Sequence, residues 1–135
     1  MAKILIIEDD RKIALALSVR LKAQKYEVVV ALDAMGGTTA AFKEKPDLIL
    51  LDISLPAGGG FMVARNVQRN FITTGVPIIF LTASKDPMIR QQAMEFEPAA
   101  FIEKPYDVDQ LQAAIRKALG ESGPASGGPP TEVPQ

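Results

Sequence analysis

The chain has 135 residues, of which 15 are basic and 16 acidic, giving a formal net charge of −1, and it contains neither cysteine nor histidine. This charge balance gives no electrostatic argument for nucleic acid or a membrane surface as a partner. The missing residue types exclude disulfides, zinc sites built on thiolate or imidazole ligands, and hydrolase triads that use a histidine base. A metal would therefore need oxygen ligands, which favours Mg2+, Mn2+ or Ca2+.

Five apolar runs alternate with five segments of helical spacing along the chain. The expected strands are 3–7, 27–31, 47–52, 76–82 and 99–102, and the expected helices are 10–24, 34–44, 60–70, 86–96 and 107–119. The run Leu48-Ile49-Leu50-Leu51 indicates a strand that is buried on both faces. This alternation predicts an α/β fold with a parallel sheet, helices on both of its faces and right-handed crossovers.

Several single residues carry expectations about the helices. Asp107 is predicted to cap the last helix at its N-terminus. Asp10 is expected to serve as an acid at the start of the first helix rather than as a metal ligand, because an acid there suits the helix dipole. Met62, Met88 and Met94 are expected to pack against the core.

The last part of the chain has a different composition from the rest. Residues 120–135 are dominated by Gly, Pro and Ser, which cannot bury enough apolar area to order a segment. The sequence therefore predicts one domain over residues 1–119, followed by a flexible tail or linker. No run approaches about 18 apolar residues and no signal peptide is recognisable, so we expect a soluble cytoplasmic protein.

Polar side chains stand at the ends of four of the expected strands. Glu8 and Asp9 follow the first strand, Asp52 ends the third, Thr82 ends the fourth and Lys104 follows the fifth. In a parallel sheet these strand ends lie on one edge, where ligands bind in open α/β folds. We therefore expect the five side chains to converge although they are far apart in the sequence.

The residue types at this edge favour phosphoryl chemistry. Closely packed carboxylates repel one another, and their ionised forms need a cation. Mg2+ typically takes one or two carboxylates together with phosphate oxygens, while a lysine and a threonine hydroxyl suit the remaining phosphoryl oxygens. A carboxylate is a weak nucleophile, so positioning and charge neutralisation must do most of the work. The pattern predicts a phosphoryl-acceptor site at Asp52.

The motifs that carry this pattern resemble the receiver domain of bacterial two-component response regulators. The resemblance covers about residues 2–119, and it implies a flavodoxin-like, doubly wound (βα)5 fold with strand order 2-1-3-4-5. The matching segments are residues 4–9, residues 47–52 with Leu55 and Pro56, residues 78–83, and residues 101–105.

The resemblance also implies roles for the acidic residues. Asp52 is expected to be phosphorylated and to bind Mg2+. Asp9 is expected to bind the metal directly, Glu8 to act mostly through a water molecule, and the backbone carbonyl of Ser54 to complete the protein ligands.

The remaining roles concern the response to phosphorylation. Thr82 is expected to move and bond the phosphoryl group, with the small Ala83 leaving room for it. Lys104 is expected to pair with Asp52 or its phosphate, and Phe101 to be an aromatic switch that turns inward when Thr82 moves. The Lys104–Pro105 bond is expected to be cis.

The implied function is that of a phosphorelay receiver. A histidine kinase or phosphotransfer protein donates the phosphoryl group, and a downstream protein or output domain reads the switched surface. The chain is expected to assist only its own phosphorylation and dephosphorylation, and to contact neither nucleic acid nor membrane. One alternative is a haloacid-dehalogenase-like phosphohydrolase. Such enzymes normally have a second acid two residues after the nucleophile, and Ser54 at that position argues against this alternative. Another alternative is a flavin-binding domain, but the carboxylates would repel the phosphate of its ligand.

Overall fold

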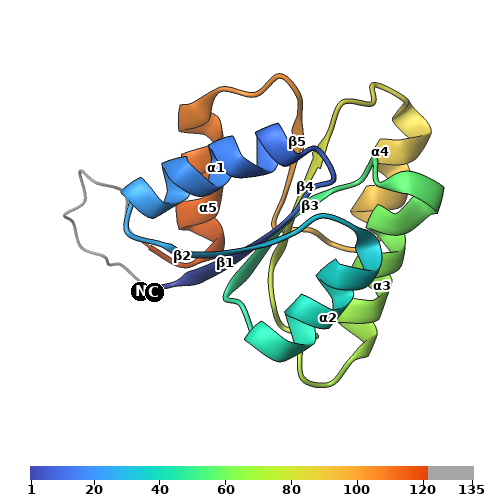
Figure 1. The fold of residues 1–135 in the computed structure, drawn as a ribbon. Helices are drawn as coiled ribbons and strands as arrows, with labels where there is room; N and C mark the ends of the chain where they lie inside the picture. Colours follow the sequence, from blue (N-terminus) through green and yellow to red (C-terminus); the bar gives the residue numbers. More distant parts are fainter. Residues whose placement is uncertain (122–135) are drawn as a thin grey trace, which may run out of the picture.

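The ten expected elements are all present in the computed structural model, which describes residues 1–121 (Figure 1). The structure adds a short 3-10 helix, Pro56–Gly58, that the sequence pattern did not predict. The elements are β1 (Lys3–Ile7), α1 (Arg11–Ala23), β2 (Glu27–Ala31), α2 (Ala34–Glu44), β3 (Leu48–Asp52), α3 (Gly59–Arg69), β4 (Ile78–Thr82), α4 (Pro87–Met94), β5 (Ala100–Glu103) and α5 (Val108–Ala118).

The five strands form one parallel sheet in the order β2-β1-β3-β4-β5, as predicted. Helices α1 and α5 cover one face, which we call the α1/α5 face, and helices α2, α3 and α4 cover the other, the α2/α3/α4 face (Figure 1). Every strand of a parallel sheet ends on the same edge, so the carboxyl ends of β1, β3, β4 and β5 lie side by side.

Alternating side chains of the strands divide the core into two clusters. Because successive residues of a strand point to opposite faces, each strand contributes to both clusters. The cluster on the α1/α5 face includes Ile4, Ile6, Leu48, Leu50, Ile79, Leu81, Leu17, Leu21, Leu111 and Ile115. The cluster on the α2/α3/α4 face includes Leu5, Ile7, Ile49, Leu51, Ile78, Phe80, Val63, Val67 and Ala93. All residues of β3 are buried, which confirms the expectation for this strand.

Aspartates cap four of the helices. The Asp10 carboxylate accepts hydrogen bonds from the backbone N–H groups of Lys12 and Ile13, so it caps α1 as expected. Asp107 accepts from the N–H of Asp109 and caps α5 in the same way. Such a cap satisfies an N–H group that would otherwise lack a partner at the start of a helix.

The expectation that the helix methionines pack in the core was wrong. Met62, Met88 and Met94 are 43%, 61% and 41% exposed. They lie on the outer sides of α3 and α4, whose inner sides carry Phe61, Val63 and Ala93 against the core. These other residues fill the inner positions, and the long methionine side chains remain at the surface.

The described fold continues slightly beyond the last helix. Gly120 adopts a positive φ of 73°, which ends α5, and the Tyr26 hydroxyl donates a hydrogen bond of 2.7 Å to Oε1 of Glu121. The expected tail falls almost wholly on residues 122–135, outside the described residues, so the limit of the domain stays a prediction. Among residues 1–121, the helices are too short or too polar to cross a lipid bilayer.

Candidate functional site

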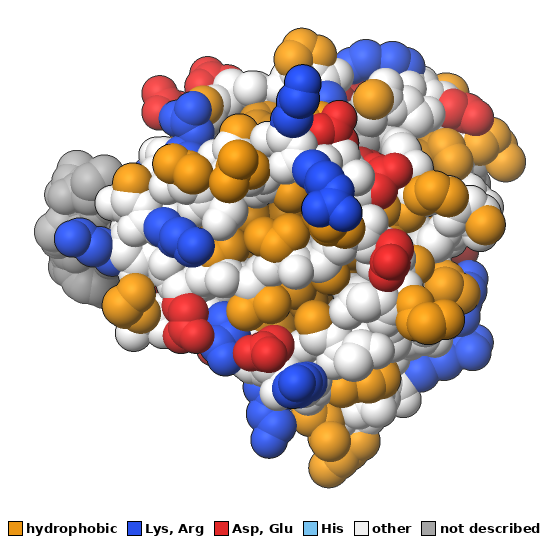
Figure 2. Space-filling view, viewed as in Figure 1, with side chains coloured by type: hydrophobic (Ala, Val, Ile, Leu, Met, Phe, Trp, Pro, Cys, Tyr) orange, Lys and Arg blue, Asp and Glu red, His pale blue; other side chains and the backbone are white. Residues whose placement is uncertain are grey.

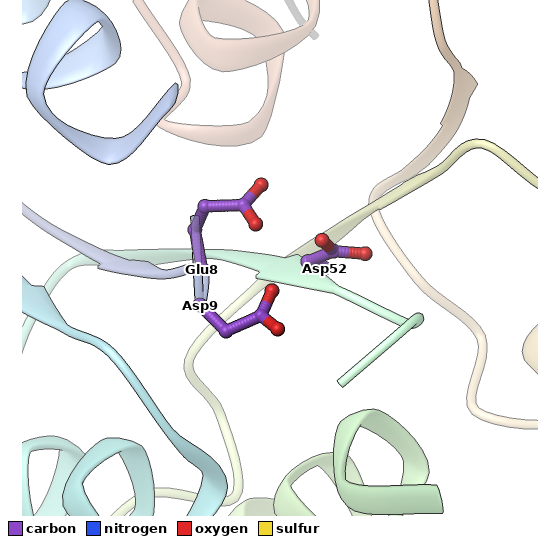
Figure 3. A group of neighbouring side chains, drawn as sticks. All are labelled: Glu8, Asp9 and Asp52. Atoms are coloured by element: carbon purple, nitrogen blue, oxygen red, sulfur yellow. The ribbon is translucent and has the colours of Figure 1, made fainter. Parts of the chain in front are cut away.

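Three carboxylates converge at the carboxyl edge of the sheet. Glu8, Asp9 and Asp52 each offer an oxygen atom, and these three atoms lie within 4.8 Å of one another. Glu8 and Asp9 leave the end of β1 on opposite sides, and Asp52 comes from the end of the neighbouring strand β3 (Figure 3). Glu8 and Asp52 are buried, whereas Asp9 is exposed. The structure therefore brings together the acids that the sequence pattern singled out.

Lys104 provides a positive charge between two of these acids. Its ammonium group lies 3.0 Å from Oε1 of Glu8 and 3.3 Å from Oδ2 of Asp52. The backbone N–H of Lys104 also donates to the carbonyl of Thr82, which holds the residue beside the end of β4. The Lys104–Pro105 bond is cis. Lys104 thus pairs with the two buried carboxylates, and with the exposed Asp9 the acids outnumber the lysine at the site.

The protonation of Glu8 reflects this environment. Burial raises the pKa of Glu8 from its ordinary value of 4.5 to about 7, although the backbone N–H of Asp10 and the ammonium of Lys104 both act to lower it. Burial lowers the pKa of Lys104, but the hydrogen bond to Glu8 and the attraction of Asp52 outweigh it, so the pKa of Lys104 is raised. Lys104 is consequently a permanent cation at neutral pH.

The backbone after Asp52 is shaped to hold this carboxylate. The Ser54 N–H donates a 2.8 Å hydrogen bond to Oδ1 of Asp52, and the Ile53 N–H bonds the carbonyl of Leu81 on β4. One oxygen of Asp52 therefore faces the chain and the other faces Lys104. Ser54 itself is exposed, and no acid stands at its position.

Gly60 is a residue of the site that the sequence analysis did not single out. A Cβ at this position would lie 2.6 Å from both the Cα and the carbonyl oxygen of Ile53, and 2.8 Å from the carbonyl oxygen of Asp52. The first turn of α3 can approach the Asp52 segment only because Gly60 has no side chain. The glycine run at the start of α3 was the available signal, but the sequence alone does not say which glycine is in contact.

Thr82 and Phe101 lie on the α2/α3/α4 face. Thr82 is buried at the end of β4, and its hydroxyl accepts a 3.0 Å hydrogen bond from the Ser84 N–H. Phe101 is half-buried on β5, in register with Phe80. Strand alternation puts Thr82 on the side of Phe80, so the threonine and the phenylalanine share a face. Asp52, which continues the alternation of Leu50, points to the other face.

The donor set fits a hard divalent cation. The cluster offers carboxylate oxygens alone, which are the ligands that Mg2+ and Ca2+ prefer. The excess negative charge of the three acids over the one lysine also favours a bound cation.

The comparisons with known proteins agree with this geometry. The model of the response regulator receiver domain family matches residues 4–116. The DNA-binding dual master transcriptional regulator RpaA of Synechocystis sp. is 34% identical over 119 residues, which cover 88% of this chain and 49% of the relative. The phosphate regulon transcriptional regulatory protein PhoB of Pseudomonas aeruginosa is 34% identical over 130 residues, which cover 96% of this chain and 57% of that protein.

A solved structure shows the same fold. The BeF3-activated N-terminal receiver domain of Klebsiella pneumoniae RstA has a TM-score of 0.79 and 29% sequence identity, and the match covers 87% of this chain and 97% of that one. The chain spans about half the length of the two curated relatives, which extend beyond the matched part. Because the family model covers most of the chain and the relatives and the fold agree with it, the chain belongs to the response regulator receiver domain family.

Proposed function

We propose that the chain accepts a phosphoryl group on Asp52 from a phosphohistidine of a histidine kinase or phosphotransfer protein. The single observation that carries this proposal is the convergence of three carboxylates within 4.8 Å, with Lys104 bridging Glu8 and Asp52. Asp52 is the central member, because it is held by the Ser54 N–H on one oxygen and meets Lys104 with the other.

The proposal includes Mg2+ as the resident metal. Asp9, Asp52 and the backbone carbonyl of Ser54 would hold the ion, with Glu8 acting through a water molecule. Bound Mg2+ supplies charge neutralisation between the incoming phosphoryl group and the carboxylates. Exposed Asp9 leaves this side of the site open to solvent, through which the ion and the donor can enter.

The chain's own residues account for the transfer. A carboxylate oxygen of Asp52 attacks phosphorus, the bond from phosphorus to the donor nitrogen breaks, and its electron pair stays on the imidazole. Lys104 keeps its positive charge beside Asp52 and pairs with an oxygen of the transferred group. The Thr82 hydroxyl, which now accepts from the Ser84 N–H, donates to another of these oxygens after it moves.

The response follows from the added charge. A phosphoryl group adds roughly two negative charges, and the movement of Thr82 draws Phe101 inward on the face that the two residues share. The pair thereby biases a two-state equilibrium of the surface built from residues 83–106. In this proposal the chain assists only its own phosphorylation and dephosphorylation and acts in the cytoplasm.

The output lies outside the chain itself. RpaA and PhoB are named as transcriptional regulators, and both extend well beyond the part that this chain matches. By analogy, a downstream protein or an output domain reads the switched surface, and this chain makes no direct contact with nucleic acid or membrane. A phosphohydrolase is disfavoured, because the exposed residue two positions after Asp52 is Ser54 and the curated relatives are regulators.

Intact mass after incubation with acetyl phosphate and Mg2+ tests the proposal. We expect one phosphoryl adduct in the wild-type chain, loss of the adduct in Asp52→Asn and loss in the presence of EDTA. Asp10→Asn is the matched control, because Asp10 caps α1 and keeps its carboxylate on that helix. Full labelling of Asp52→Asn would refute the assignment, and multiple turnover of a phosphate ester would support the phosphohydrolase instead.

A further inference from the structure

A cation–π contact joins helix α4 to the ring of Phe101. The guanidinium carbon of Arg90 lies 5.0 Å from the centroid of the Phe101 ring. Arg90 is exposed on α4, and Phe101 is half-buried on β5, with its inner side against the core of the α2/α3/α4 face. Neither the sequence pattern nor the proposed transfer assigns Arg90 a role.

The two ends of α4 are held differently. The C-terminal end is anchored, because Ala93 is fully buried and the Phe96 ring stacks on Phe61 at a centroid distance of 5.5 Å. The side-chain amide of Gln68 on α3 also donates a 2.6 Å hydrogen bond to the carbonyl of Phe96. Nearer the N-terminal end, Ile89 packs against the same core with partial burial, whereas Met88 and Arg90 on either side of it are exposed to solvent. Arg90 therefore touches Phe101 from the solvent-exposed side of the helix.

The same residues line a shallow groove of about 410 Å3 between α4, β5 and α5. Its lining residues are Lys85, Arg90, Phe101, Glu103, Pro105 and Gln110. Lys85 pairs with the Glu103 carboxylate at 3.3 Å, and both partners are exposed enough to exchange with water or with another cation. Glu103 is thus a carboxylate that lines the same groove as Arg90.

We propose that Arg90 is a positioning residue of the switch: its contact with the Phe101 ring holds that ring in the half-buried orientation and favours the unphosphorylated state. The inference rests on the proposed function, in which Phe101 turns inward after Asp52 is phosphorylated. Inward rotation removes the ring face from Arg90, and the guanidinium then competes with Lys85 for Glu103. The ion pairs in the groove between α4, β5 and α5 consequently change when the Phe101 ring turns inward.

The size of the effect follows from the exposure of the contact. An exposed cation–π pair changes a two-state equilibrium by about two- to five-fold. A small phosphodonor reacts with the fraction of molecules that already has the activated arrangement, so the labelling rate reports this equilibrium. Loss of the Arg90 contact is therefore expected to make labelling faster.

The test measures the rate of Asp52 labelling by acetyl phosphate and Mg2+ in the full chain. Arg90→Gln should label about two- to five-fold faster than wild type, whereas Arg90→Lys, which keeps the cation, should stay closer to wild type. Phe101→Leu removes the ring face, so adding Arg90→Gln to it should have no further effect. Arg65→Gln, on an exposed arginine of α3, is the matched control and should leave the rate unchanged.

Two outcomes would overturn the inference. One is a rate in Arg90→Gln that equals or falls below that of wild type, as expected for an arginine that only supports folding. The other is an unchanged effect of Arg90→Gln in the Phe101→Leu background.

A second readout separates this inference from the proposed function. If wild type takes no phosphoryl group, the proposed function fails, and NMR of labelled phenylalanine still tests the contact without phosphate. The Phe101 ring resonances, assigned by their loss in Phe101→Leu, should shift in Arg90→Gln and not in Arg65→Gln. Unshifted Phe101 resonances in Arg90→Gln would overturn the inference on its own.

Discussion

The two faces of the sheet differ in the side chains they bring to the carboxyl edge. Glu8, Asp52 and Lys104 continue the alternation of the α1/α5 face and form a network of charges. Thr82 and Phe101 belong to the α2/α3/α4 face, whose core cluster includes the rings of Phe80, Phe61 and Phe96. Alternation along a strand thus places the charged side chains and Phe101 on opposite faces of the sheet. The two sets approach each other at the strand ends, which is where the proposed function assigns Thr82 its role.

The side of the molecule drawn in Figure 2 does not repeat this division. Figure 2 shows acidic, basic and hydrophobic side chains interspersed over one side of the molecule, with no single-sign area that dominates the view. This mixture matches the nearly neutral charge of the chain. The difference between the two faces of the sheet lies in their buried side chains, so variants with buried changes test it best.

The largest effect is expected from damage to the aromatic side of the core. Phe80 is fully buried and makes edge contacts with Phe61 and Phe96. Phe80→Ala should lower the free energy of unfolding by about 3–5 kcal/mol, because it leaves a cavity the size of a ring. Urea denaturation measures this loss. Phe71→Ala is the control: its side chain is 93% exposed, and the change should stay within about 0.5 kcal/mol.

The same variant also tests whether metal binding on one face of the sheet depends on the aromatic core of the other face. Under conditions where Phe80→Ala remains folded, it should still bind Mg2+ with nearly wild-type affinity, because Glu8 and Asp52 lie on the opposite face of the sheet from the Phe80 ring. Loss of metal binding in the folded variant would contradict the separation of the two faces.

A medium effect is expected where α3 meets the segment after Asp52. Gly60→Ala should cost about 1–3 kcal/mol in urea denaturation, because its Cβ would overlap backbone atoms that cannot move independently. It should also slow labelling of Asp52, since those atoms belong to Asp52 and Ile53. Gly75→Ala is the matched control, because no atom lies within 4 Å of a Cβ at that position. Equal losses in the two variants would mean that the close approach at Gly60 is unimportant.

The smallest expected effect is the pH dependence that Glu8 gives to stability and to Mg2+ binding. The pKa of Glu8 is raised by burial to about 7, so the folded chain holds this proton more tightly than the unfolded chain does. The contribution of Glu8 to stability is therefore full below its ordinary pKa of 4.5 and is lost as the pH rises through about 7. Mg2+ has to compete with the same proton, so its affinity should be about tenfold lower at pH 6 than at pH 8.

Calorimetry of Mg2+ binding across this pH range measures the effect. Glu8→Gln should remove the part of the pH dependence with a midpoint near 7, because glutamine does not titrate there. An unchanged pH profile in Glu8→Gln would assign the titration to another group.

The sequence predicted the fold because its local signals were consistent with one another. The apolar run at β3, the aspartate caps and the strand–helix alternation each point to the same parallel sheet. The convergence of Glu8, Asp52 and Lys104 followed from the topology alone, since parallel strands share a carboxyl edge.

Other features depend on distances that a sequence does not contain. Whether Met62 and Met88 face the core depends on how each helix is rotated about its axis, and the structure turns both outward. The position of Gly60 against Ile53 and the placement of Arg90 over Phe101 also arise only from packing. The sequence pattern identified the polar residues at the strand ends, but it did not identify the residues that pack around them, such as Gly60 and Arg90.

In the proposed function, Thr82 transmits the change at Asp52 to Phe101. NMR of labelled phenylalanine, recorded with Mg2+ before and after addition of beryllofluoride as a phosphoryl mimic, tests it directly. We expect the Phe101 ring resonances to move in wild type and to stay in place in Thr82→Ala, although the mimic binds to both. Movement of the Phe101 ring in Thr82→Ala that equals the wild-type movement would contradict the role proposed for Thr82.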